Sequence, residues 1–82
     1  FVGIENQWID DLQIHPNPSS GLFNIELPEI TQIAVLDATG RKVIETTGNG
    51  RFTLDLGLYP TGTYTLQLRT ENLFGAKQLV KY

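Results

Sequence analysis

The 82-residue sequence has no cysteine and a single histidine, so few residues are available for nucleophilic, acid–base or metal chemistry. Without cysteine there is no disulfide, no thiolate nucleophile and no cysteine-based zinc site. His15, Ser19 and Ser20 have no neighbour in the sequence that would position or activate them. No glycine-rich phosphate loop leads into a helix, and no apolar run approaches the roughly 18 residues of a transmembrane helix. We predict a protein that is not an enzyme and has no catalytic residue, metal site, cofactor or membrane span.

Lysine and arginine are absent from residues 1–40, which contain six acidic residues, whereas residues 41–82 contain six basic and three acidic residues. The net charge of −3 argues against nucleic acid as a partner, because a basic patch is the electrostatic signature of that interaction. We expect folding to bring the two halves together, so that their charges partly neutralise one another on the surface.

Apolar and polar residues alternate along most of the chain, which is the period of a half-buried strand. Phe23, Ile25 and Leu27 show this alternation clearly, and Thr, Val and Ile are frequent in the short runs between glycines and prolines. The segments with strand character are residues 12–14, 23–27, 33–36, 43–44, 52–56, 64–68 and 76–82. Their spacing of roughly 8–12 residues is typical of a sandwich or barrel.

These patterns predict an all-β fold, an immunoglobulin-like antiparallel β-sandwich of about seven short strands. The expected core consists of Phe23, Ile25, Val35, Phe52, Leu54, Leu56, Tyr64, Leu66 and Leu68. Residues 1–11 have no clear period and are predicted to be a linker to an upstream domain, with the folded domain over residues 12–82. The absence of an initiator methionine leads us to expect a segment of a longer protein.

Four turns are predicted between these strands. Pro16, Asn17, Pro18 and Gly21 belong to a tight reversal, since the prolines cannot lie inside a sheet. At residues 37–40, Asp37 is expected to accept hydrogen bonds from amides two residues on, and Gly40 to take a positive φ. Residues 48–50, Gly-Asn-Gly, and residues 59–62, which end at Gly62, are predicted to be hairpin turns.

From Ile14 to Tyr82 these segments, in this order, resemble the type A C-terminal sorting domain of type IX secretion. The matching segments are residues 16–21 (PNPSSG), 35–41 (VLDATGR), 54–56 (LDL), 62–64 (GTY) and 77–81 (KQLVK). Each of these short motifs alone occurs in many unrelated proteins. Their occurrence together, in this order along the chain, is specific to the family. His15 stands where the family often has tyrosine, and Leu36 stands where an aromatic residue is common.

The resemblance implies a secretion signal that directs a cargo protein through the type IX translocon across the outer membrane. It implies a Gram-negative source, passage through the periplasm and a final location outside the cell or on its surface. It also implies that a surface sortase-like protease removes the domain, and we expect cleavage at or before Asp11. The implied partners are the translocon with its shuttle proteins, the protease and the upstream cargo domain.

The resemblance places recognition by the translocon on the terminal strand and on one turn. The strand residues are Lys77, Gln78, Leu79, Val80 and Lys81, and the turn residues, a second contact, are Asp37, Gly40 and Arg41. A regular strand puts Lys77, Leu79 and Lys81 on one face, and we expect both lysines to be exposed. Edge-strand lysines also serve to block unwanted pairing, so this alternative stays open. For Arg41, an ion pair with Asp37 or Glu26 is the alternative to a contact with a partner.

A second function remains open, an immunoglobulin-like structural or carbohydrate-binding module of a secreted multidomain protein. Trp8 and Tyr59 would suit an aromatic platform for sugars. The aromatic residues are scattered along the sequence and do not share one strand face, so the sorting function is favoured.

Overall fold

A computed structural model describes residues 12–82 of the chain, and the linker predicted over residues 1–11 lies outside the described residues. The described part is built of strands β1 (Ile14–His15), β2 (Leu22–Leu36), β3 (Lys42–Asp55), β4 (Gly62–Arg69) and β5 (Phe74–Lys81), with no helix. The predicted all-β fold is confirmed for these residues.

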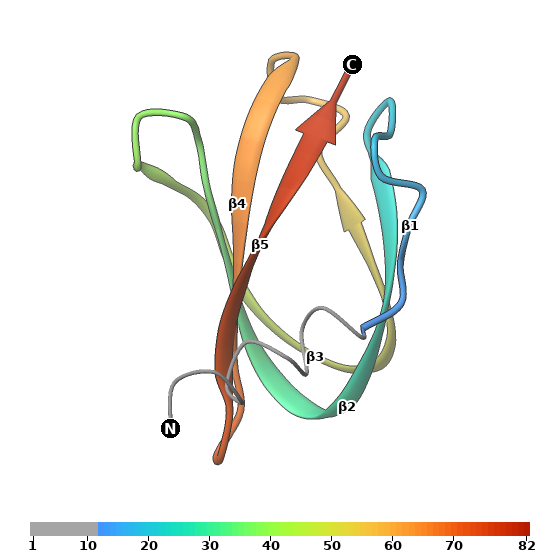
Figure 1. Cartoon of the computed structure of the whole chain (residues 1–82), viewed down its shortest axis with the longest axis vertical. Helices are drawn as coiled ribbons and strands as arrows, with labels where there is room; N and C mark the ends of the chain where they lie inside the picture. Colours follow the sequence, from blue (N-terminus) through green and yellow to red (C-terminus); the bar gives the residue numbers. More distant parts are fainter. Residues whose placement is uncertain (1–11) are drawn as a thin grey trace.

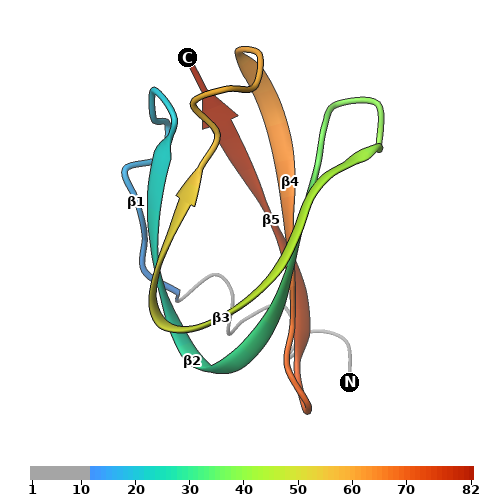
Figure 2. The same cartoon turned by 180° about the vertical axis from the view of Figure 1, so that it is seen from behind.

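The five strands form one antiparallel sheet that curls until its two ends face each other (Figure 1). The long β2–β3 hairpin runs through both halves of the curl. The first half of β2 pairs with β1 and with the end of β3, whereas the second half pairs with the start of β3 and with β4. Strand β5 pairs with β4 and ends the order β1-β2-β4-β5. The two facing layers make the arrangement sandwich-like, as the view from behind also shows (Figure 2).

The hairpin bends where its register shifts, between Leu27 and Thr31 of β2. Leu27 lies opposite Gly50 and Thr31 lies opposite Gly48, so pairing continues on both sides of the shift. Gly48 lies against the core at this bend. A Cβ atom there would come within 2.7 Å of the Phe52 ring, which is closer than real contacts allow. Glycine at position 48 therefore lets the bend pack closely against the side chains of the core.

The expectation of about seven short strands was wrong, because four of the predicted segments belong to two long strands. Residues 23–27 and 33–36 both lie in β2, and residues 43–44 and 52–56 both lie in β3. The predicted hairpin turn at residues 48–50 is instead the bend inside β3. Residues 59–62 do not form a hairpin turn either, since β4 pairs with β2 and β5 and the connection from β3 crosses between the layers. The last strand begins at Phe74, two residues before the predicted start.

The core lies between the two layers and contains most of the predicted residues. Phe23, Val35, Leu56, Leu66 and Leu68 are fully buried, and Phe52 is half-buried against them. The structure adds Leu27, Ile33 and Leu79 to the core. The Tyr64 hydroxyl donates to the carbonyl of Pro60, four residues upstream, a contact that resembles the tyrosine corner of immunoglobulin-like sandwiches.

Two ion pairs join acidic residues of the first half of the sequence to basic residues of the second half. Arg51 Nε lies 3.3 Å from Glu26 Oε1 across β2 and β3, and Arg41 Nε lies 3.5 Å from Asp37 Oδ2. The expected surface neutralisation is thus present at these pairs. Each pair is exposed on at least one side and adds little to stability.

Replacing a core leucine should destabilise the domain, whereas replacing an exposed one should not. Leu66→Ala leaves a cavity between the layers and is expected to cost about 2–5 kcal/mol of unfolding free energy. Leu58 is 99% exposed, so Leu58→Ala is the matched control and should change stability by less than about 0.5 kcal/mol. Urea unfolding of the three proteins measures both values. Equal midpoints for the two variants would contradict the described core.

Candidate functional site

Strand β5, which contains the predicted recognition residues, lies at one edge of the sheet. Its register with β4 is regular over all eight residues, from Phe74 opposite Arg69 to Lys81 opposite Gly62. Side chains therefore alternate between the inner and outer faces. Leu79 is fully buried on the inner face, and Gln78 and Val80 are exposed on the outer face.

Lys77, Leu79 and Lys81 share one face, as predicted, but this face is directed into the sandwich. The expectation that both lysines are exposed was wrong for Lys81, which is only 9% exposed. Its ammonium donates to the carbonyl of Tyr59 at 2.5 Å and lies 3.4 Å from the carbonyl of Gly57. Lys81 therefore ties the end of β5 to the loop between β3 and β4.

Lys77 differs from Lys81 in its surroundings. It is half-buried opposite Leu66, and its ammonium has no hydrogen bond or ion pair to any residue between 12 and 82. Within β5, it is the lysine whose charge is not engaged by the described part of the domain.

Asn17, in the predicted proline turn, binds β5 directly. Its side-chain amide donates to the Gln78 carbonyl at 3.1 Å, and its Oδ1 atom accepts from the Val80 amide at 3.1 Å. The side chain thus makes the pair of bonds that a neighbouring strand would make. Pro16 and Pro18 flank it as exposed residues without backbone donors.

Ser19 continues this contact along the same edge. Its amide donates to the Val80 carbonyl and its carbonyl accepts from the Tyr82 amide, both at 3.0 Å, which gives a short parallel bridge to Lys81. Gly21 follows, buried, and its carbonyl accepts from the Leu56 amide at 2.7 Å. The loop from Asn17 to Ser19, here called the edge clip, therefore covers the C-terminal half of the β5 edge.

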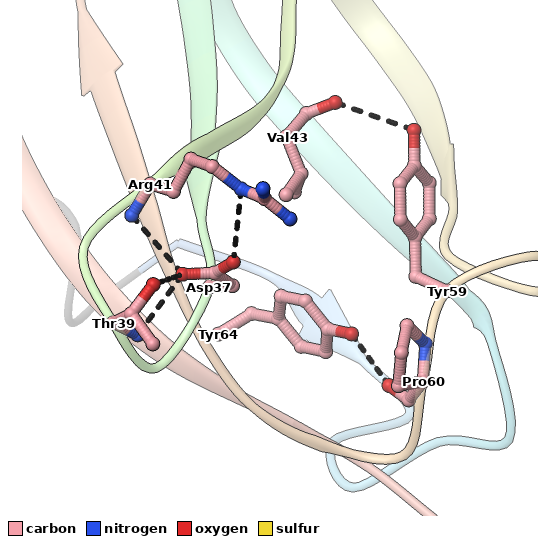
Figure 3. Close-up of polar contacts among 7 residues, drawn as sticks. All are labelled: Asp37, Thr39, Arg41, Val43, Tyr59, Pro60 and Tyr64. Atoms are coloured by element: carbon pink, nitrogen blue, oxygen red, sulfur yellow. Dashed lines mark hydrogen bonds and ion pairs between the residues drawn. The ribbon is translucent and has the colours of Figure 1, made fainter.

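The predicted second contact, the turn between β2 and β3, is organised by one carboxylate (Figure 3). Asp37 Oδ1 accepts from the Thr39 hydroxyl at 2.6 Å and from the amides of Thr39 and Arg41 at 2.9 and 3.0 Å. Gly40 has a φ of 91°, a conformation that favours glycine. Both turn predictions are confirmed. Asp37 also forms the ion pair with Arg41, whose side chain is 80% exposed.

Hydrogen bonds hold the pKa of Asp37 below the value usual for an aspartic acid. The Thr39 hydroxyl is the main cause, followed by the Arg41 amide, with a smaller contribution from the Arg41 charge. All of these contacts stabilise the ionised carboxylate over its neutral form. Asp37 is therefore a fixed negative charge at neutral pH.

The turn at residues 37–41 and the end of β5 lie at the same end of one layer, which consists of the start of β3, the end of β2, β4 and β5. Leu36 is opposite Thr65 of β4, and Thr65 is opposite Gln78 of β5. Strand β4 separates the two features, and no hydrogen bond or ion pair between described residues joins them. Gly62 is the first residue of β4 and faces Lys81 across the pair.

Residues 13–82 match the sequence model of a known protein family, which is described as "Secretion system C-terminal sorting domain". The chain belongs to this family of type IX secretion sorting domains. A comparison with curated proteins found no match. Membership shows that the domain is a C-terminal sorting signal that works with type IX secretion machinery and serves secretion or export to the cell surface.

Two negative observations apply to the described part of the sorting domain. No group of three histidine or acidic side chains between residues 12 and 82 is arranged to hold a metal ion. The same residues include no helix long and apolar enough to cross a membrane.

Sequence reasoning missed the edge clip and the role of Lys81 in the sorting domain. Asn17 lies 61 and 63 residues from its two partners, and Lys81 lies 22 residues from Tyr59. One signal was present, since asparagine and serine side chains readily bind backbone groups. Nothing in the sequence showed which strand they would bind.

Lys81→Met should destabilise the sorting domain more than Lys77→Met. Methionine keeps the apolar stem but removes the ammonium, so Lys81→Met loses charged hydrogen bonds worth about 1.5–3 kcal/mol. The melting temperature should fall by at least about 6 °C, given roughly 4–8 °C per kcal/mol for a domain of this size. Lys77→Met is expected to change it by less than about 2 °C. Differential scanning calorimetry measures both, and a Lys81→Met protein that melts at or above the parent temperature would contradict this role.

Acidification should weaken the residue 37–41 turn. Because the folded-state pKa of Asp37 is lowered, its stabilising contribution is present above the unfolded pKa of about 4 and is lost as pH falls through the folded value. Carbon-detected NMR titration should show Asp37 titrating below the value usual for an aspartic acid, about 4. In Asp37→Asn, the unfolding free energy should depend less on pH below about 4 than in the parent. Titration of Asp37 at or above that usual value would be inconsistent with the bonds described.

Proposed function

We propose that this domain directs an upstream cargo protein through the type IX translocon across the outer membrane and is then removed by a sortase-like protease. The observation that carries the proposal is the family match over residues 13–82, which includes both the edge clip and the terminal strand. The proposed route passes through the periplasm, and the proposed partners are the translocon, its shuttle proteins and the protease. The domain acts as a tag and performs no chemistry of its own.

Recognition is proposed to centre on β5, with the turn at residues 37–41 as a second contact. Three contacts support this choice, since Lys81, Asn17 and Ser19 hold the end of β5 to two separate loops. A strand held in this way presents its remaining groups in a fixed geometry, which limits the entropy lost on binding. The unengaged ammonium of Lys77 and the exposed side chain of Arg41 are the charges available to a partner.

Removal is proposed to occur at or before Asp11. The described fold begins with Leu12 packed against the core and with the Glu26 amide bonded to the Gln13 carbonyl at 3.1 Å. Backbone that is paired in this way is protected from proteases. A cut beyond Leu12 would require local unfolding of β1.

The proposal is tested by fusing the 82-residue chain to the C-terminus of a reporter in a bacterium with a type IX system. The fusion is expected to reach the medium or cell surface, and the fusion without residues 77–82 is expected to stay inside. N-terminal sequencing of the released fragment should give a start at or before residue 12. Retention of the intact fusion, or a start beyond Pro18, would contradict the sorting role or the cleavage boundary respectively.

A charge variant separates recognition from folding. Lys77→Glu reverses the charge of an ammonium that has no hydrogen bond or ion pair within residues 12–82, so the melting temperature of the variant should stay within about 2 °C of the parent. Export of the reporter should fall at least tenfold. Lys77→Arg, which keeps the positive charge at the same position, is the matched control and should be exported normally. Normal export of Lys77→Glu would show that this charge is not read.

A further inference from the structure

The outer face of β5 is uncharged, which is unusual for a strand at the edge of a sheet. Its outward residues are Phe74, Ala76, Gln78 and Val80, all exposed. Natural edge strands are commonly guarded by charged side chains, a proline, a bulge, an inward-pointing charge or a covering loop, because an open edge invites pairing with another chain. Here both lysines are on the inner face and the β4–β5 register has no bulge. The outer face of β5 around Ala76 therefore has no charged side chain of its own to block pairing.

Backbone groups of the same strand point out of the sheet. In an antiparallel pair, alternate residues of a strand direct their amide and carbonyl away from the neighbouring strand. The bonds from Val80 and Gln78 to the edge clip show that the even-numbered residues of β5 are the outward ones. The amide and carbonyl of Ala76 and the amide of Gln78 follow this pattern, and residues 12–82 provide no hydrogen-bond partner for them. A short stretch of unpaired edge thus lies next to the clip.

A positive charge lies beside the start of this stretch. The Arg69 guanidinium, from β4, is positioned over the ring of Phe74, with 5.4 Å between its central carbon and the ring centroid. It has no ion pair with any acidic residue of the described part. The arginine lines a hollow of about 530 Å³ on the outer face, together with Gln67, Phe74 and the ion pair of Lys42 and Glu45. The small side chain of Ala76 opposite Gln67 leaves the side of this hollow nearest the edge unobstructed.

We propose that the edge of β5 around Ala76 and Gln78 is a docking site for an extended segment of the secretion machinery, which adds to the sheet as a further strand. Main-chain bonds to Ala76 and Gln78 supply affinity, and side chains that alternate along the added strand supply selectivity. An acidic side chain of that segment, placed on the outer face, pairs with Arg69. This inference rests on the proposed sorting function and names the kind of surface that is read.

The edge clip disfavours a second copy of this chain as the occupant. Antiparallel pairing of two copies about Ala76 would set residue 78 of each opposite residue 74 of the other, and residue 80 opposite residue 72. Asn17 and Ser19 already occupy the edge at Gln78 and Val80. Two copies would therefore share only the few residues around position 76.

Ala76→Pro tests the docking site through the backbone alone. Proline removes the outward amide of residue 76 without removing a bond to β4, and edge strands accept proline where the amide faces solvent. The preceding residue is Gly75, which reduces the steric restriction that proline imposes on its predecessor. In the reporter fusion, Ala76→Pro should lower export at least tenfold. Ala76→Ser keeps the amide and should be exported normally.

Folding and recognition are separated by a melting curve of each full chain. Ala76→Pro is expected to melt within about 5 °C of the parent. Gln78→Pro removes the other unpaired amide, and its melting temperature and export are compared with those of Gln78→Thr. Normal export of either proline variant would overturn the docking site. If one variant proves unfolded, the other decides. Failure of the unaltered chain to export the reporter is a separate result, which contradicts the proposed function itself.

The charge contact and the alternative occupant have their own measurements. Arg69→Gln should lower export severalfold, whereas Arg51→Gln, an exposed arginine on the other layer, should not. Equal export of these two variants would overturn the acidic contact. Sedimentation of the purified chain is expected to show a monomer, and a dimer that Ala76→Pro dissociates would overturn a foreign strand as the occupant.

Discussion

The bend of the β2–β3 hairpin is the constraint on which the rest of the structure depends. Strands of 15 and 14 residues stay paired on both sides of a register shift, so one hairpin contributes to both layers of the sandwich. The core exists only because this bend brings Phe23 and Leu54 of one layer opposite Leu66 and Leu79 of the other. In a chain without disulfides, burial of these side chains is the main term that offsets the entropy of ordering the backbone.

Once the layers face each other, the terminal strand can be held from two directions. The edge clip binds its outer edge through Asn17 and Ser19, and Lys81 binds the loop between β3 and β4 from the inner side. These contacts join the sequence segments PNPS and KQLVK, which lie at opposite ends of the family match. The two segments form one structural unit, because each supplies hydrogen-bond partners for the other.

The two lysines of β5 share one face of the strand but differ in their contacts. Both lie on the inner face, but Lys81 is enclosed at the end of the sandwich where carbonyl oxygens meet its ammonium. Lys77 lies nearer the start of β5, opposite Leu66, and is only half-buried. A long side chain at such a position can pack its stem against apolar neighbours and keep its charge near water. The end of β5 is thus held by the fold, and its first half keeps both an unengaged charge and open backbone groups.

The sequence by itself determined the features that depend on local patterns. Alternation of apolar and polar residues predicted the all-β fold and most of the core, although it missed Leu27, Ile33 and Leu79 and included the half-buried Phe52. The spacing of Asp37, Thr39 and Gly40 predicted a turn closed within five residues. The ordered segments identified the sorting-domain family, which the match over residues 13–82 confirmed.

Tertiary structure decided what depends on residues far apart in the chain. Short strand segments were read as separate strands because a glycine-rich bend inside a long strand and a hairpin turn have the same composition. The same limit applies to Asn17 and Lys81, whose partners lie 22 to 63 residues away. Hydrogen bonds of this kind form only after the layers pack, so the folded sheet selects the carbonyls and amides that these side chains reach.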